Sequence, residues 1–187
     1  MARAAARSRT AAAGANLVVY HGTDVHERER RFALQAARQA AAMSPAVRFE
    51  IVGDEALARM AAGLANVAVV PQLAWPEYLR AQTGRQAAIS LAPLFPSPLN
   101  DARAPVKAFD AARLGATGLY ADAPAYRGAV KDGEDGLLLP MESAAWARAI
   151  TTLIGDPDRR RRLAQAARER LIRRLGSGPC FPARPAE

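Results

Sequence analysis

Short apolar segments alternate with helix-like segments along most of the chain, and no other feature restricts the fold as strongly. The apolar segments are residues 16–20, 47–53, 66–71, 87–93, 117–122 and 136–140. The stretches between them place apolar residues three and four positions apart, which is typical of amphipathic helices. Strands joined by helices run parallel, with helices covering both faces of the sheet. The sequence therefore predicts an α/β domain with a doubly wound, mostly parallel six-stranded sheet.

The same patterns predict the helices and the edge of the sheet where a ligand would bind. Helices are expected at residues 26–43, 54–63, 75–84, 105–115, 124–133, 142–156 and 157–176. Asp54 is a candidate N-cap, because its short side chain can accept a bond from a free helix amide. The last helix carries an apolar stripe at a spacing of four, formed by Leu163, Ala167, Leu171 and Leu175. In doubly wound sheets, ligands bind at the loops that follow the carboxyl ends of the strands.

The net charge of +8 is concentrated at the two ends of the chain. Residues 1–14 contain three arginines and no acidic residue, and residues 156–187 contain nine arginines against four acidic residues. Residues 15–155 are balanced, with 14 basic and 14 acidic side chains. A nucleic-acid-binding domain should carry its excess charge on the folded body, so we expect no nucleic-acid partner. The basic ends suit contact with an anionic membrane surface.

The sequence predicts a chain of four parts. We expect a cytoplasmic protein, with the inner membrane face as an alternative location. Residues 1–14 are expected to be a disordered leader, or alternatively an organellar transit peptide. Residues 15–155 form the domain, residues 156–176 a helix that packs on the domain or on a partner, and residues 177–187 a flexible tail. The single cysteine, Cys180, excludes a disulfide framework and a thiolate metal site. No apolar run is long enough to span a bilayer.

Three familiar signatures of α/β enzymes are missing from the sequence. It has no G-x-G-x-x-G after the first strand and no Walker A lysine loop. The nucleophile signature G-x-S-x-G is missing as well. Dinucleotide reduction, P-loop nucleotide hydrolysis and α/β-hydrolase chemistry are therefore disfavoured.

The segment after the fourth strand is the richest candidate site. A helix begins near Pro105, and the free amides at a helix N-terminus suit a phosphate. Lys107 lies in the first turn, where the helix dipole disfavours a cation unless an anion binds there. Asp110 follows three residues later on the same face and could accept hydrogen bonds from the hydroxyls of a ribose. The alternative is that Lys107 and Asp110 form an ion pair on a solvated face.

Several segments from residue 20 to residue 140 resemble a known family when they are taken in order. They are "GTDVHERE" after the first strand, "EIVGD", "WPEYL", "LAPL" and the long stretch "PLNDARAPVKAFDAARLGATGLYADAPAYRGAVKDGEDGLLLP". The chain is similar to the C-terminal, nucleotide-sugar-binding half of GT-B-type retaining glycosyltransferases of the "group 1" class. The similarity covers about two-thirds of the chain. It implies one Rossmann-like half of a GT-B fold.

The resemblance assigns catalytic and donor-binding roles to individual residues. Lys107 and Asp110 match the lysine and the glutamate of the family's K-x-x-E element, which implies contacts with the diphosphate and the ribose. Family members usually carry another glutamate eight residues before the acid, where this chain has Ala102. Asn100 is the substitute candidate for a contact with the donor sugar. Pro105 marks the helix start that would face the phosphates.

The loops around this cleft supply further candidates. Gly22 and Thr23 could lend backbone amides to the diphosphate, and Tyr126 could stack on the donor or donate a hydrogen bond, with packing as the alternative. Trp75 lies at the level of the nucleobase in this family, and a core aromatic is the alternative. His26 could be a ligand or an ordinary residue at a helix start. The run Arg159–Arg162 is expected to be a solvated face.

The resemblance also implies a missing partner. A GT-B enzyme has two such domains around its active site, so we expect a second, acceptor-binding domain or chain. The donor would be a nucleoside-diphosphate sugar, and no metal or other cofactor is expected, because helix amides and cations hold the diphosphate. Two alternatives stay open: a non-catalytic nucleotide-sugar-binding or scaffold module, and a GT-B-type epimerase acting on the same donors.

Overall fold

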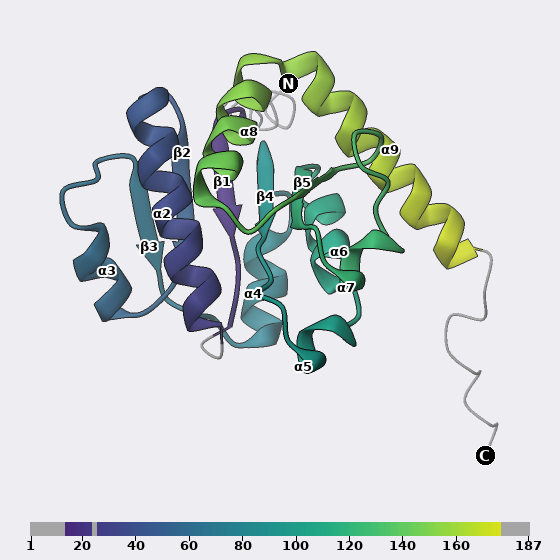
Figure 1. Cartoon of the computed structure of the whole chain (residues 1–187), viewed down its shortest axis with the longest axis horizontal. Helices are drawn as coiled ribbons and strands as arrows, with labels where there is room; N and C mark the ends of the chain where they lie inside the picture. Colours follow the sequence, from purple (N-terminus) through teal and green to yellow (C-terminus); the bar gives the residue numbers. More distant parts are fainter. Residues whose placement is uncertain (1–13, 24–25, 177–187) are drawn as a thin grey trace.

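The chain folds into one parallel sheet of six strands, as predicted (Figure 1). The computed structural model describes residues 14–23 and 26–176. The strands are β1 (Leu17–Tyr20), β2 (Arg48–Val52), β3 (Val67–Val70), β4 (Ile89–Ala92), β5 (Thr117–Ala121) and β6 (Leu137–Leu139). Their order across the sheet is β3-β2-β1-β4-β5-β6, and every pairing is parallel. The chain therefore winds outward in both directions from β1 and β4.

Helices cover both faces of the sheet, and their bounds are as follows. They are α2 (Glu27–Met43), α3 (Glu55–Ala61), α4 (Trp75–Gln82), α5 (Pro98–Asp101), α6 (Val106–Arg113), α7 (Pro124–Arg127), α8 (Ser143–Gly155) and α9 (Pro157–Gly176). In Figure 1, α2, α3 and α8 lie in front of the sheet, and α4 and α6 lie behind it. This arrangement confirms the doubly wound α/β domain that the alternating pattern predicts.

The core lies between the sheet and the α2–α8 pair. Trp146 of α8 is fully buried, and its ring meets Phe32 of α2 edge-on at a centroid distance of 5.4 Å. The indole N–H donates to the carbonyl of Pro140 over 2.8 Å, so its one polar atom is satisfied. Asp54 caps α3 by accepting from the amide of Leu57, which confirms the predicted N-cap.

Two local segments differ from the sequence-based expectation. Residues 98–101 form α5, a short helix where a loop was expected, because Ser97 caps it and accepts from the amide of Asn100. The predicted helix 124–133 ends after one turn. Beyond it the chain turns through Gly133, whose φ of 74° lies in the left-handed region that favours glycine. The carboxylate of Asp135 accepts from the amide of Lys131, which closes this turn instead of a helix.

Helix α9 is attached by polar anchors as well as by its apolar stripe. Leu163 is buried in the core, while Ala167 and Leu171 line a 300 Å³ cavity between α9 and α6. The prediction that Arg160 lies on a solvated face is wrong. Its guanidinium is buried and donates to the carbonyls of Leu153 and Ala15 over 2.8 and 3.0 Å. It therefore holds the end of α8 against the start of β1.

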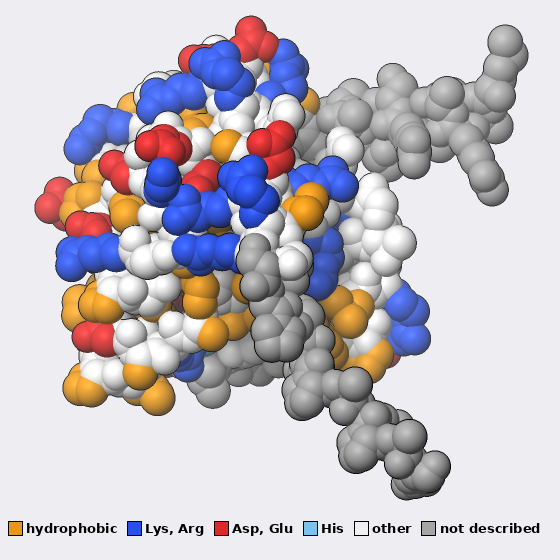
Figure 2. Space-filling view, turned by 90° about the vertical axis from the view of Figure 1, so that its right-hand side faces the viewer, with side chains coloured by type: hydrophobic (Ala, Val, Ile, Leu, Met, Phe, Trp, Pro, Cys, Tyr) orange, Lys and Arg blue, Asp and Glu red, His pale blue; other side chains and the backbone are white. Residues whose placement is uncertain are grey.

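The face that carries α9 shows more Lys and Arg side chains than acidic ones (Figure 2). Several of these arginines are paired, including Arg170 with Asp135 at 3.1 Å and Arg173 with Glu169 at 4.0 Å. None of the helices in the described part of the chain is both long enough and apolar enough to cross a membrane. The predicted tail (177–187) and residues 1–13 of the predicted leader (1–14) lie outside the described residues.

Candidate functional site

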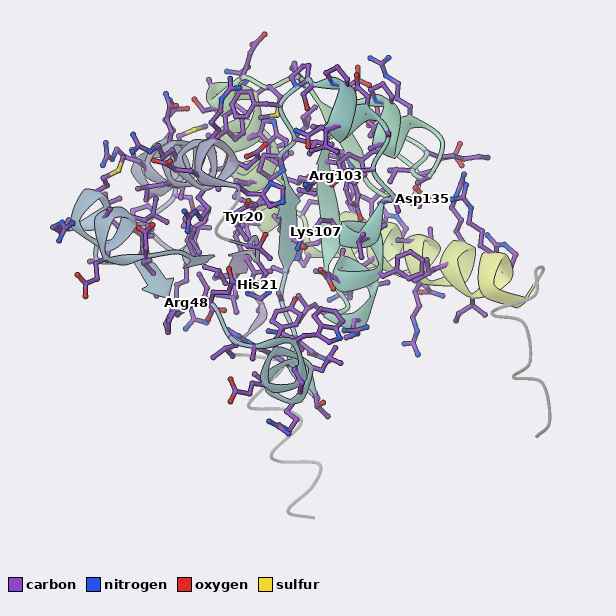
Figure 3. The ribbon with its side chains drawn as sticks, turned by 90° about the horizontal axis from the view of Figure 1, so that it is seen from below. Tyr20, His21, Arg48, Arg103, Lys107 and Asp135 are labelled. Carbon is purple, nitrogen blue, oxygen red and sulfur yellow. The ribbon has the colours of Figure 1, made fainter. Side chains whose placement is uncertain are left out.

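The predicted site residues gather at the carboxyl ends of β1 and β4, where the winding direction of the sheet reverses. Two cavities, of 180 and 230 Å³, open here, and Lys107 lines both of them. The smaller one contains Asp110 and is called the Asp110 cavity below. The larger one contains Arg103 and is called the Arg103 cavity. Figure 3 looks onto this edge and shows Tyr20, His21 and Lys107 near its centre, with Arg103 beyond them.

Lys107 and Asp110 form an ion pair within the cleft instead of on a solvated face. Helix α6 places them one turn apart, with Nζ of Lys107 3.2 Å from a carboxylate oxygen of Asp110. The Asp110 side chain is only 10% exposed, and that of Lys107 is 30% exposed. Lys107 also donates to the backbone carbonyl of His21, which follows β1. This contact joins the two halves of the sheet across the point where they diverge.

The other walls of the Asp110 cavity come from the loops after β1 and β3. Gly22 and Thr23 follow β1, while Leu73 and Trp75 follow β3. Trp75 is 59% exposed, and its ring stacks on that of Tyr78 with the planes 22° apart. An exposed aromatic face in the same cavity as a buried carboxylate is suited to a ligand in which a flat ring is attached to a group that carries hydroxyls.

A polar network supports this cavity from beneath. His21 is buried, with Nε2 3.0 Å from Glu50 and Nδ1 3.2 Å from the hydroxyl of Tyr78. Arg85 donates to the second carboxylate oxygen of Glu50. Burial alone would raise the pKa of Glu50, but hydrogen bonds from His21 and Arg85 lower it to about 2. Burial and the charge of Asp110 raise the pKa of Tyr78 to about 12, so the phenol keeps its proton.

The Arg103 cavity has a different character, because cations and phenols line it. Arg103 lies between α5 and α6, and its guanidinium nitrogen is 2.8 Å from Nε2 of His26. Burial and the nearby charge of Arg103 lower the pKa of His26, so the ring is neutral and accepts this hydrogen bond. The buried phenols of Tyr20 and Tyr126 form the floor of the cavity. Burial raises the pKa of Tyr126 to about 12.

The structure brings five of the seven predicted donor-binding residues into these cavities and leaves two outside them. Gly22, Thr23, Lys107 and Asp110 line the Asp110 cavity, and Tyr126 lines the Arg103 cavity with Lys107. Asn100 and Pro105 line neither. The amide of Asn100 donates to the carbonyl of Phe95 over 2.8 Å, so its assigned sugar contact stays a prediction. Pro105 precedes the first residue of α6 and lines the cavity beneath α9 instead.

Sequence reasoning missed Arg103 and His21. Arg103 stands four residues before Lys107 in the same loop-to-helix segment, which was the available signal. His21 directly follows β1, where a site residue is expected, but nothing in the sequence indicates that Glu50 would hold it. Neither Arg28 nor Arg31 reaches the two cavities: Arg28 lies 4.3 Å from the ring centre of Phe95, and Arg31 pairs with Glu27 at 2.6 Å.

A sequence model of the family described as "Glycosyl transferases group 1" matches residues 15–156. The chain belongs to this family. The match begins just before β1 and ends after α8, so it spans the whole sheet and both cavities of this glycosyltransferase domain. No curated protein matches the sequence.

Solved glycosyltransferase structures share the fold. The C-terminal domain of the group 1 family protein LpcC from Francisella tularensis superposes with a TM-score of 0.67 at 16% identity, covering 85% of each chain. HepE from Anabaena, solved with UDP and glucose, gives 0.66 at 18% identity, covering 93% of this chain and 52% of its own. Sucrose-phosphate synthase from Thermosynechococcus elongatus gives 0.66 at 22% identity, covering 89% and 44%. The chain thus spans about half the length of the last two. Its likeness to these structures confirms one half of a GT-B fold.

Within the described residues, no group of three or more His, Cys, Asp or Glu side chains is arranged to hold a metal ion. The polar groups that line the two cavities include two cations, one carboxylate, three phenols and the loop after β1. This set can bind a polyanion next to a group that carries vicinal hydroxyls.

Proposed function

We propose that this chain binds a nucleoside-diphosphate sugar in the two cavities and acts as the donor-binding half of a glycosyltransferase. The observation that carries the proposal is the position of Lys107 and Asp110. Both lie in the cleft at the reversal point of the sheet, and together they line a cavity with the β1 loop and Trp75. The solved structure of HepE with UDP and glucose supports the same ligand class.

The nucleoside is proposed to occupy the Asp110 cavity. The base lies against Trp75, whose exposed ring offers a stacking face, and the ribose hydroxyls donate to the carboxylate of Asp110. The aspartate already lies at the cleft surface with one oxygen on Lys107, so its other oxygen has lone pairs for a ribose. The diphosphate then passes over Lys107 and the amides of Gly22 and Thr23 toward the Arg103 cavity.

In the proposed reaction, the bond between the anomeric carbon and the terminal phosphate oxygen breaks, and an acceptor oxygen bonds to that carbon. The nucleoside diphosphate leaves with the extra negative charge, and the acceptor hydroxyl gives up its proton. Lys107 and the first turn of α6 stabilise the charge that develops on the leaving group, and no metal ion is required for this step. The acceptor and the groups that handle its proton are proposed to come from a second domain or chain.

A thermal-shift screen of the purified chain against UDP, GDP, TDP, ADP and CMP tests the donor site. A nucleotide at about 100 times its Kd should stabilise the fold by roughly 2.7 kcal/mol, a rise in Tm of several degrees. Asp110→Ala should remove most of this shift. Asp101→Ala is the matched control, because it removes an exposed carboxylate from the adjacent α5 and should keep the shift.

The outcomes separate the proposal from its alternatives. A shift with one nucleoside diphosphate that is lost in Asp110→Ala supports the donor site and names the base. Binding with no glycosyl transfer, even when an acceptor domain is supplied, would favour a scaffold module. Release of free nucleoside diphosphate from the sugar nucleotide without an acceptor would favour an epimerase. A cooperatively melting protein that responds to none of the five nucleotides would refute the proposal.

A further inference from the structure

The cleft needs more positive charge than Lys107 provides. A bound diphosphate carries at least two negative charges, and phosphate oxygens in such clefts take charge-assisted hydrogen bonds from Lys or Arg. The charge of Lys107 is already shared, because its ammonium donates to the carboxylate of Asp110 and to the carbonyl of His21. The terminal phosphate therefore requires a second cation.

Arg103 is the second cation among the residues that line the two cavities. Its guanidinium contacts the neutral ring of His26, and no carboxylate of the described residues lies within ion-pair distance of it. A guanidinium has five N–H donors, and one bond to an imidazole leaves most of them for a ligand. Within residues 14–23 and 26–176, no carboxylate therefore neutralises the charge of Arg103, which lies on the wall of a 230 Å³ cavity that also contains Lys107.

The arginines at the start of α2 do not compete for this role. Arg28 lies over the ring of Phe95, Arg30 is within 3.4 Å of a carboxylate oxygen of Asp54, and Arg31 pairs with Glu27. None of the three lines the Asp110 cavity or the Arg103 cavity. The loop after β1 therefore offers backbone amides to the ligand, and the strong cation comes from the segment between α5 and α6.

The contact with His26 fixes the position of Arg103 in the empty site and still leaves its guanidinium available to a phosphate. The ring accepts from Arg103 through Nε2, while Nδ1 faces a carboxylate oxygen of Glu29 at 3.7 Å. A neutral acceptor is weaker than a phosphate oxygen, so a phosphate can take the guanidinium from the ring with a net gain. The contact with His26 keeps Arg103 directed into the cavity when the site is empty.

We propose that Arg103 binds the terminal phosphate of the donor, with His26 as its partner in the empty site. This assignment rests on the proposed function, because it presumes that the nucleoside occupies the Asp110 cavity. It makes a specific claim about affinity: Arg103 should distinguish nucleoside diphosphates from the corresponding monophosphates. Lys107 and Asp110 should contribute to the binding of both.

The test is isothermal titration of the full chain with UDP, GDP, TDP and ADP, and with the monophosphate of each, for the wild type and Arg103→Met. The wild type should bind the diphosphate of one pair at least about tenfold tighter than the monophosphate, a difference of about 1.4 kcal/mol. Arg103→Met should reduce this ratio to about threefold or less and leave the monophosphate affinity unchanged. Arg103→Lys, which keeps the charge but loses the planar fork, should give an intermediate ratio.

Arg31→Met is the matched control, because it removes an arginine five residues after His26 that is exposed and paired with Glu27. Arg31→Met should keep the wild-type ratio of diphosphate to monophosphate affinity. If any loss of positive charge lowered this ratio, Arg31→Met would lower it as well. An unchanged ratio in Arg103→Met would overturn the assignment, and so would an equal loss of affinity for both nucleotides. If the wild type binds none of these nucleotides, the proposed function fails, and the assignment fails with it.

Discussion

The contact of Glu50 with His21 and Arg85 should make the domain sensitive to acid in a specific pH window. The pKa of Glu50 falls from 4.5 to about 2 on folding. A depressed carboxyl pKa stabilises the fold above the unfolded value, and this stability is lost as the pH falls toward the folded value. The shift corresponds to at most about 3 kcal/mol near neutral pH, and about 2 kcal/mol of it should disappear between about pH 5 and pH 3.

The perturbation that isolates this effect is Glu50→Gln, since glutamine keeps the shape and cannot ionise. Urea unfolding followed by far-UV circular dichroism gives the free energy of unfolding of both proteins at each pH. The wild type should be the more stable of the two near pH 6, and the gap should close by about 2 kcal/mol as the pH falls to about 3. Glu77→Gln, on the outer side of α4, is the control and should give a constant difference.

A gap between the wild type and Glu50→Gln that stays constant from about pH 6 to pH 3 would refute this reasoning. It would mean that His21 and Arg85 stabilise the carboxylate of Glu50 no more than they stabilise an uncharged amide. A gap that widens on acidification would be a stronger contradiction, because it has the opposite sign to that of a depressed pKa.

Two further changes test the packing that positions the site. Arg160→Met should destabilise the domain by about 2 kcal/mol in urea unfolding, because it removes a buried guanidinium that donates to the carbonyls of Leu153 and Ala15, whereas the exposed Arg161→Met should cost less than about 0.5 kcal/mol. Gly118→Ala should lower the Tm by several degrees, since the added Cβ would lie 2.0 Å from the hydroxyl of Tyr120, a ring that is 1% exposed and has little room to move. A melting temperature equal to that of the wild type would contradict this account of Gly118.

The sheet could be predicted from the sequence because its evidence is local. Each strand is a short apolar run, each connection has helical spacing, and parallel pairing follows from the two together. Lys107 and Asp110 could be predicted for the same reason, as the pair is defined by a spacing of three within one helix. The start of α5 could also have been predicted, because Ser97 followed by Pro98 is a helix N-terminus signature, but the sequence analysis placed a loop there.

The remaining site features depend on contacts between distant parts of the chain. Arg103 meets His26 across 77 positions, and His21 meets Glu50 across 29. Neither pair produces a periodic sequence pattern, because Arg103 and His26 meet between two loops and His21 meets Glu50 of the neighbouring strand β2. Asn100 was chosen only as a substitute near Ala102, and its local contacts with Ser97 and Phe95 could not be predicted from the family pattern, so its sugar contact stays a prediction.

The two tryptophans occupy opposite environments, and this gives the protein a pair of independent optical reporters. Trp146 is fully buried in the core, so its emission should be blue-shifted and should change only on global unfolding. Trp75 is largely exposed beside the Asp110 cavity, so its emission should be red-shifted and open to quenching by a stacked base. In a Trp146→Phe background, fluorescence would follow occupancy of the nucleoside position directly, without any label.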